Sequence, residues 1–142
     1  MTVLDAFAVI ALFKAEPAAG QVRGLIEGGG CALTTIGVAE VVDHLVRLVG
    51  VCDEDAVLDV AQLGLDPAIE LNGGAAVQAA LLRAWHYSKR RQVSLGDCVA
   101  AAVARIGQRS VATSDPHLLD LCHDVGIGVI PLPDSSGSLW SA

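Results

Sequence analysis

The sequence lacks a long hydrophobic run, although it is strongly apolar. Hydrophobic residues make up 53% of the 142 positions and charged residues only 18%, a composition that excludes a disordered chain. The longest unbroken apolar stretch, Ala6–Phe13, falls far below the roughly 18 residues that a membrane span needs. No Lys or Arg precedes this stretch, so we expect no signal peptide. We therefore expect one domain with a buried core, located in the cytoplasm.

Paired cysteines, aromatic residues and positive charge are also scarce. The four cysteines, Cys31, Cys52, Cys98 and Cys122, stand far apart, so a structural zinc site has no ligand spacing and we expect four small buried apolar residues. Aromatic residues make up 4% of the chain, too few for a base-stacking platform. The net charge of −7 excludes a surface that binds nucleic acid by positive charge alone. Any contact with phosphate must be local or use a metal ion.

Short apolar runs alternate with segments of helical period. Strands are predicted at Thr2–Asp5, Cys31–Thr34, Pro67–Leu71, Ser110–Thr113 and Ile127–Leu132. Helices are predicted from Ala6, Pro17, Thr35, Asp53, Asn72, Ser94 and Pro116 onward. This alternation predicts an α/β fold with a mostly parallel sheet of about five strands. Residues 1–133 form the predicted domain, and residues 134–142 are expected to be a loosely held tail.

Two helices lead to explicit expectations about the core. The helix from Thr35 is predicted to reach Gly50, with Val46 and Val49 among the residues that face the core. In the helix that begins after Asn72, Trp85 is expected to anchor the core rather than to stack on a base.

Four acidic residues follow the predicted strands. Asp5 comes directly after Val3-Leu4, Glu40 and Asp97 lie in the first turns of helices, and Asp115 follows the strand that ends at Thr113. Because parallel strands share one carboxyl edge, at least three of these acids should meet there. Carboxylates in close contact stay ionised only with a cation. Oxygen ligands without Cys or His suit Mg²⁺ or Mn²⁺.

Each acid also has a purely structural interpretation. Asp5 and Asp115 can cap the helices that follow them. Asp97 stands three residues after Ser94, as in a capping box, and Glu40 can belong to a solvated helix face. Since caps after parallel strands gather at one edge as well, the pattern alone leaves both interpretations open.

Four segments together resemble the PIN-domain ribonucleases, specifically the VapC-type toxins of toxin–antitoxin pairs. They are Val3–Ala8, Gly37–Val41, Leu95–Ala102 and Ala112–Asp115. The resemblance spans almost the whole chain and implies a three-layer α/β/α fold, a homodimer and an antitoxin protein that covers the site. It also implies that RNA phosphodiester bonds are hydrolysed with Mg²⁺ or Mn²⁺. The residues that it assigns are Asp5, Glu40, Asp97 and Asp115 as catalytic metal ligands and Thr113 as a supporting hydroxyl.

Two positions depart from the family pattern, and one basic stretch adds to it. Phe7 stands where the family commonly has Ser or Thr, so a polar contact beside Asp5 is missing. Gly96 removes a side chain at the start of the helix that carries Asp97. The basic stretch formed by Lys89, Arg90 and Arg91 is a candidate RNA contact beside the site. A solvated loop is the alternative.

Other functions remain open on the sequence. A receiver-like or phosphatase-like domain also gathers acids around Mg²⁺, but Phe7 occupies the place of a phosphatase's second acid and Ile127–Leu132 has no receiver lysine. A non-catalytic interaction module, whose acids only cap helices, is a further alternative. The apolar excess of Ala6–Phe13 and Val22–Ile26 predicts a helical partner at these segments.

Overall fold

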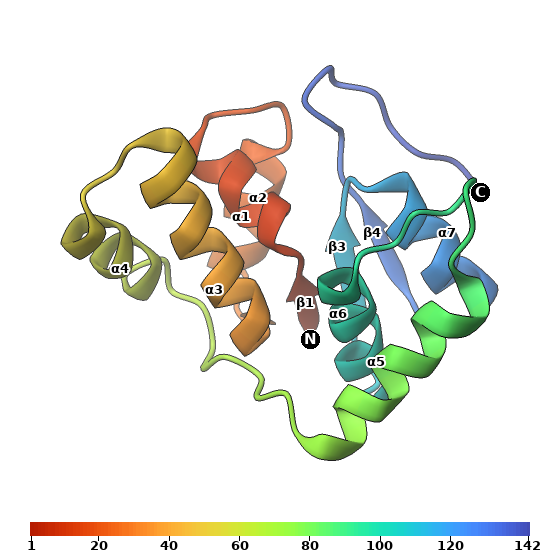
Figure 1. Ribbon diagram of the computed structural model, residues 1–142. Helices are drawn as coiled ribbons and strands as arrows, with labels where there is room; N and C mark the ends of the chain where they lie inside the picture. Colours follow the sequence, from red (N-terminus) through yellow and green to blue (C-terminus); the bar gives the residue numbers. More distant parts are fainter.

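The computed structural model describes the whole chain, residues 1–142, and places a parallel sheet between two groups of helices (Figure 1). The strands are β1 (Thr2–Leu4), β2 (Cys31–Ala32), β3 (Ser110–Thr113) and β4 (Val129–Pro131). Their order is β2-β1-β3-β4, and every pairing is parallel. The α/β fold predicted from the alternation of strands and helices is confirmed.

The sheet has four strands instead of about five. The segment Pro67–Leu71 forms only one parallel bridge, between Ile69 and Thr34. The Ile69 N–H donates to the carbonyl of Leu33 at 2.9 Å, but Pro67 has no N–H with which to extend the ladder. The expected third strand is therefore reduced to a single contact beyond the end of β2.

Seven α-helices surround this sheet. They are α1 (Ala6–Phe13), α2 (Ala19–Glu27), α3 (Thr35–His44), α4 (Asp53–Ala61), α5 (Gly73–His86), α6 (Leu95–Ile106) and α7 (Pro116–Asp124). No helix is both long enough and apolar enough to span a bilayer.

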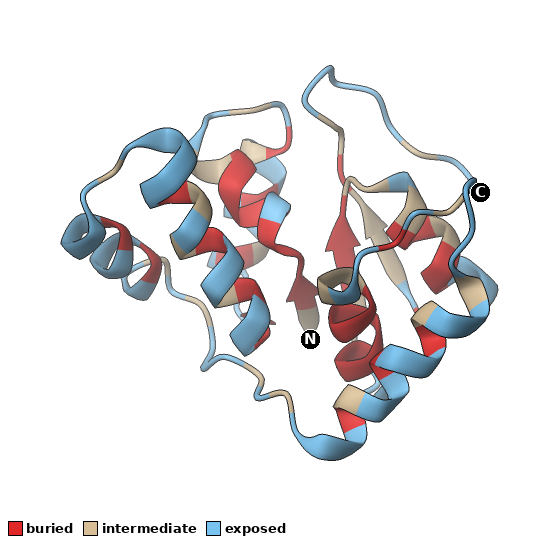
Figure 2. Cartoon of the chain, viewed as in Figure 1, coloured by how far each residue is buried: buried red, intermediate tan, exposed pale blue.

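The sheet separates two hydrophobic cores. Val3 and Val111 belong to the core beneath α5, α6 and α7, whereas Leu4 and Ala112 belong to the core beneath α1 to α4. This division follows from the geometry of a β-strand, in which successive side chains point to opposite faces of the sheet. Figure 2 shows buried residues on β1, β3 and the inner faces of the helices, whereas β4 is intermediate. With both faces covered, the middle of the central strands is apolar without alternation, as in Val3-Leu4 of β1 and Val111-Ala112 of β3.

The segment after α3 departs from the expected regular helix. Leu45–Val49 forms a π-helical turn, η1, which ends at Gly50 with a left-handed φ of 86°. A π-turn holds an extra residue per turn and so rotates the side chains that follow it. Val46 and Val49, which were expected in the core, are exposed.

The prediction that Trp85 anchors the core is wrong. Its side chain is 70% exposed, and α5 instead buries Ala75, Ala79 and Leu82. The small alanines let α5 pack closely along α6, whose middle is also rich in buried alanine. Because α5 carries apolar residues on two faces, periodicity alone favoured the face with the larger side chains.

Two smaller expectations also fail. The apolar residues of α1 and α2 do not provide excess surface, because α1 packs against α2, α3 and β3, and Phe7 is the only large apolar side chain of the two helices that is exposed. Cys52 is exposed, whereas the other three cysteines are buried as expected.

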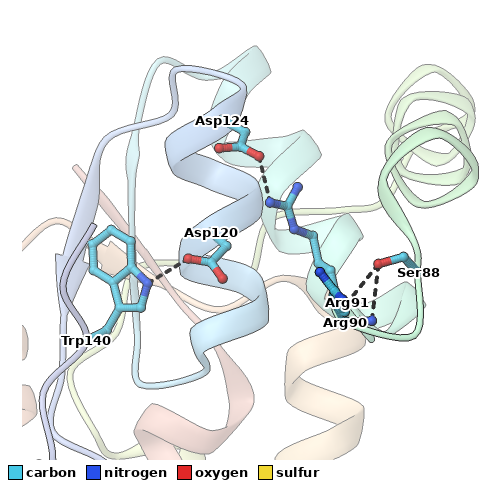
Figure 3. Close-up of polar contacts among 6 residues, drawn as sticks. All are labelled: Ser88, Arg90, Arg91, Asp120, Asp124 and Trp140. Atoms are coloured by element: carbon cyan, nitrogen blue, oxygen red, sulfur yellow. Dashed lines mark hydrogen bonds and ion pairs between the residues drawn. The ribbon is translucent and has the colours of Figure 1, made fainter.

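The C-terminal residues return to α7 (Figure 3). A turn at Asp134–Ser138 is closed by the Asp134 carboxylate, which accepts from the N–H groups of Ser136 and Ser138 at 2.9 Å. The Trp140 indole N–H donates to Asp120 of α7 at 2.8 Å. These contacts define the path of residues 134–142, whose mobility stays a prediction.

Candidate functional site

Asp5 lies at the carboxyl end of β1, next to the end of β3. The pairing of Leu4 with Ala112 brings Asp5 beside Thr113. Asp5 also caps α1: its Oδ1 accepts from the Ala8 N–H at 2.7 Å, and its Oδ2 accepts from the Thr113 hydroxyl. The residue is only 5% exposed. Both oxygens of a buried carboxylate are thus fixed by the fold.

Thr113 connects Asp5 to a second acid. Its Oγ1 accepts from the Asp115 N–H at 3.0 Å while its proton goes to Asp5. Asp115 caps α7 by accepting from the His117 N–H at 2.8 Å. A single hydroxyl therefore sets the relative position of two strand-end acids.

Asp97 enters the same region from α6. It forms a capping box with Ser94, in which the Asp97 N–H donates to Ser94 Oγ at 3.0 Å and the Ser94 N–H donates to Asp97 Oδ2 at 3.2 Å. The structural interpretation of Asp97 is correct, and so is that of the caps Asp5 and Asp115. Capping does not exclude a functional role, since each side chain keeps the position that its cap imposes.

Glu40 reaches the site from α3 through the space left at Gly96. A Cβ atom on residue 96 would lie 2.7 Å from Glu40 Oε1, closer than nonbonded atoms approach. The departure from the family pattern at Gly96 therefore has a local consequence, because it lets the Glu40 carboxylate lie against the start of α6.

A small pocket brings these groups together. Asp5, Glu40 and Asp97 line it, along with Phe7 and Gly96. Asp115 lies close enough to add its negative charge to both Asp5 and Asp97. The structure thus brings all four predicted acids to one edge of the sheet.

Burial raises the pKa values of Asp5, Asp97 and Glu40, and the charges of neighbouring acids add to the rise for Asp5 and Asp97. For Asp5, burial raises the pKa to about 7, the hydrogen bonds from Thr113 and Ala8 oppose this rise, and the charges of Asp97 and Asp115 add to it. For Asp97, burial and then the charge of Asp115 raise the pKa to about 6. Partial burial also raises the pKa of Glu40. Such a cluster is more easily ionised beside a cation.

The carboxylate oxygens of the site are the kind of ligand that a hard divalent cation prefers, but in this structure they do not converge on one point. No three His, Cys, Asp or Glu side chains stand close enough together to hold one metal ion. Binding therefore requires the less constrained carboxylates to turn toward a common point. The donors are all oxygen atoms, and the buried charge that they create on ionisation lacks a counter-ion, which suits Mg²⁺ or Mn²⁺.

The basic stretch is tied to the end of α7 opposite to Asp115, and its contact with RNA stays a prediction. Arg91 forms an ion pair of 2.6 Å with Asp124, and Ser88 Oγ accepts from the N–H groups of Arg90 and Arg91 (Figure 3). Asp124 ends α7, whose first residue follows Asp115, so a nine-residue helix of about 13 Å separates the two ends. The stretch is a turn tied to the far end of α7, with Lys89 exposed.

Sequence reasoning did not identify Phe7 and His44 as a pair. Phe7 is 56% exposed at the rim of the acidic pocket. The His44 ring lies edge-on to it, with 6.1 Å between the ring centroids. The available signal was the spacing of His44, one helical turn after Glu40.

Comparisons with known proteins agree with this geometry. The family model described as PIN domain matches residues 2–123. One similar solved structure is FitAcB from Neisseria gonorrhoeae, with a TM-score of 0.69 and 18% identity over 92% of this chain and 96% of that chain. A toxin–antitoxin complex from Klebsiella pneumoniae has a TM-score of 0.60 and 17% identity over 81% of this chain and 87% of that chain. VapBC2 from Rickettsia felis bound to a promoter DNA fragment has a TM-score of 0.67 and 14% identity over 91% of this chain and 96% of that chain. Comparison with curated protein sequences gives no match.

At these identities, the solved structures establish the fold alone. They support the three-layer arrangement and the parallel sheet described above. The family model, in contrast, covers most of the sequence, and the acids that it was expected to bring together do meet at one sheet edge. The chain belongs to the PIN domain family.

Proposed function

We propose that this chain is an endoribonuclease that hydrolyses RNA phosphodiester bonds with Mg²⁺ or Mn²⁺, as the toxin of a toxin–antitoxin pair. The observation that carries the proposal is the burial of Asp5 among acids whose charges help to raise its pKa to about 7. A helix cap alone needs neither burial nor other acids nearby. Such a concentration of perturbed carboxyl groups is typical of a functional site.

The residues have distinct proposed roles. Asp5, Asp97 and Asp115 hold the cation, and Glu40 completes the ligand set. A divalent cation held by these residues would supply Lewis-acid chemistry: polarisation of a phosphoryl oxygen and a lower pKa for the attacking water. Thr113 is a positioning residue, because it holds Asp5 by donating and Asp115 by accepting. Glu40, on the exposed side of the pocket, would orient the water for in-line attack on phosphorus; the bond to the 3′ oxygen breaks, which leaves a 5′ phosphate and a 3′ hydroxyl.

An antitoxin is the proposed protein partner, acting with the toxin in the cytoplasm. A hollow of about 430 Å³ between α3 and α4 is lined mostly by apolar residues. Next to it, Val57 and Leu58 of α4 are exposed, and the first turn of α4 carries three acids, Asp53, Glu54 and Asp55. This surface is complementary to an amphipathic segment that combines apolar with basic side chains.

A second copy of the chain is the other proposed partner. Val77, Leu81 and Trp85 are exposed at successive turns of α5 and so form one apolar stripe. The stripe contains no charged residue, so a two-fold axis across it would bring no like charges together. We assign the homodimer contact to this face.

The test compares Asn variants at the site with a matched acid elsewhere. Asp5→Asn and Asp97→Asn should abolish cleavage of single-stranded RNA with Mg²⁺ or Mn²⁺, because Asn removes the charge while it still accepts the capping hydrogen bond. Asp59→Asn on the exposed side of α4 should cleave like the wild type. Full cleavage by both site variants would contradict the proposal.

A non-catalytic interaction module predicts a different metal response. The ribonuclease should gain thermal stability from Mg²⁺ or Mn²⁺, and Asp5→Asn should gain less. In an interaction module, neither protein would respond to the divalent ion. The two measurements together separate the enzyme from the module without knowledge of its natural RNA.

A further inference from the structure

A second hollow adjoins the acidic pocket. Its volume is about 310 Å³, and it lies between the start of α1 and the junction of α3 with η1. Phe7 and Glu40 line both hollows. Ala6, Ile10 and Leu48 complete the apolar part of the second one, and His44 lies on its polar side. A molecule bound at the acids therefore lies next to a cavity whose lining is half apolar and half polar.

Folding alone does not account for the exposed ring of Phe7. Its neighbours Ala6 and Ala8 are buried, so α1 already has its inner face filled and Phe7 lies on the outer one. His44 contacts the ring edge-on and holds it without covering it. An exposed aromatic face at the rim of a polar pocket is typical of a ligand site.

We propose that the second hollow binds the nucleobase beside the scissile phosphate, with Phe7 as the surface on which that base stacks. This inference rests on the proposed function and adds a substrate-positioning residue to it. The phosphate would lie at the acids, and the base of the same nucleotide is held within a few ångströms by the ribose. The hollow beside Phe7 offers the flat apolar contact that this base needs.

The polar rim of the hollow can distinguish between bases. Arg47 and Asp43 form a two-bond ion pair, with Nε and Nη2 of Arg47 donating to the carboxylate at 3.1 and 3.0 Å. This pairing holds the guanidinium at the cavity and leaves Nη1 to donate to a base edge. The π-turn η1 contains both Arg47 and Leu48, so the irregular helix contributes two lining residues.

The decisive experiment is a mutant cycle between protein and RNA. The substrate is a short single-stranded RNA with a mapped cleavage site, alongside copies that lack the base on either side of that site. With wild-type protein, one of the abasic copies should show kcat/KM reduced about tenfold, the scale of one stacking contact. Phe7→Ala should lose about tenfold on intact RNA and nothing more on that abasic copy.

Two control variants make this result specific. Phe7→Tyr keeps an aromatic face and should stay within about twofold of the wild type. Ile106→Ala removes an equally exposed apolar side chain at the far end of α6. It should leave kcat/KM unchanged on both the intact and the abasic RNA. If the losses from Phe7→Ala and from base removal are additive, the proposed base subsite is wrong. It is also wrong if Phe7→Ala leaves kcat/KM on intact RNA unchanged.

The outcomes also separate this inference from the function on which it rests. If wild-type protein cleaves RNA and Phe7→Ala behaves like wild type, only the subsite is wrong. If wild-type protein neither cleaves nor binds RNA in the presence of Mg²⁺ or Mn²⁺, both the function and the subsite are wrong. Binding of intact and abasic RNA to Asp97→Asn gives a second readout, in which Phe7→Ala should remove the preference for the intact strand.

Discussion

The Thr113 hydroxyl donates to the Asp5 carboxylate and at the same time accepts from the Asp115 backbone. Thr113→Val keeps the shape of the side chain but removes both interactions. We expect a loss of about 1–2 kcal/mol in the free energy of unfolding, a further rise in the pKa of Asp5, and slower cleavage. Chemical denaturation and RNA cleavage measure these effects. Thr113→Ser should keep both stability and cleavage near the wild-type level. Normal cleavage by Thr113→Val would show that Thr113 does not position the acids.

The raised pKa of Asp5 makes stability depend on pH. The folded pKa of about 7 exceeds the ordinary value of 3.8, so between pH 4 and 7 the folded chain retains a proton that the unfolded chain has lost. Stability must then fall as pH rises through this window, by about 4 kcal/mol at most for Asp5 alone. Asp97 acts in the same direction up to about pH 6.

Urea unfolding of wild type and Asp5→Asn at several pH values isolates this effect. The variant should gain stability relative to the wild type between pH 5 and 7.5, since Asn cannot ionise. Mg²⁺ should restore part of the wild-type stability at pH 7.5. A difference between the two proteins that does not vary with pH would contradict the assignment of a raised pKa to Asp5.

Gly96→Ala should separate activity from stability. The added Cβ meets Glu40 Oε1 at 2.7 Å, and the flexible Glu40 side chain would move away from the acids. Since Ala favours a helix over Gly by about 1 kcal/mol, thermal unfolding should be unchanged or raised while cleavage falls about tenfold or more. Gly24→Ala, in α2 with no atom near the new Cβ, is the control. Gly96→Ala should cause no further loss in a Glu40→Ala background.

The basic turn offers a prediction about salt dependence. Lys89 and Arg90 are exposed, and neither forms an ion pair. If both contact phosphate, the double variant Lys89→Gln/Arg90→Gln should bind single-stranded RNA less tightly. Its slope of log affinity against log salt should be smaller by about 1.4. Arg23→Gln/Arg105→Gln is a charge-matched control, and an unchanged slope would assign the turn to solvation.

Trp85→Asp should produce a monomer. A charge placed in the stripe of Val77, Leu81 and Trp85 would face its own copy across a two-fold axis, with no compensating partner. Sedimentation equilibrium measures the result, and Leu139→Asp, at an equally exposed position in the tail, should leave the association unchanged. A Trp85→Asp dimer as tight as the wild type would move the contact elsewhere.

The sequence predicted the features that follow from chain topology. Asp5 and Asp115 could be placed at one edge because parallel strands end there, wherever their helices pack. The exposed face of α5 could not be predicted, because both faces of that helix are apolar and only the close approach of α6 decides between them. The π-turn that exposes Val46 and Val49 leaves no periodic signal of its own.

Contacts between distant segments are the part of the site that the sequence could not predict. Arg91 is held by Asp124, 33 residues away, and no local pattern reveals that partner. The second hollow depends on Phe7 meeting His44 from another helix. Composition could not show that one of the few aromatic residues, Phe7, stands beside the acids.

Asp5 and Asp115 each begin a helix in addition to contributing charge. Asparagine is also a common N-cap residue. Asp5→Asn and Asp115→Asn should therefore remove both charges and still cap α1 and α7. If the proposed toxin activity holds, a doubly substituted chain should accumulate in a growing host to a higher level than the intact chain. Such an inactive double variant would supply material for crystallising the protein in complex with intact RNA.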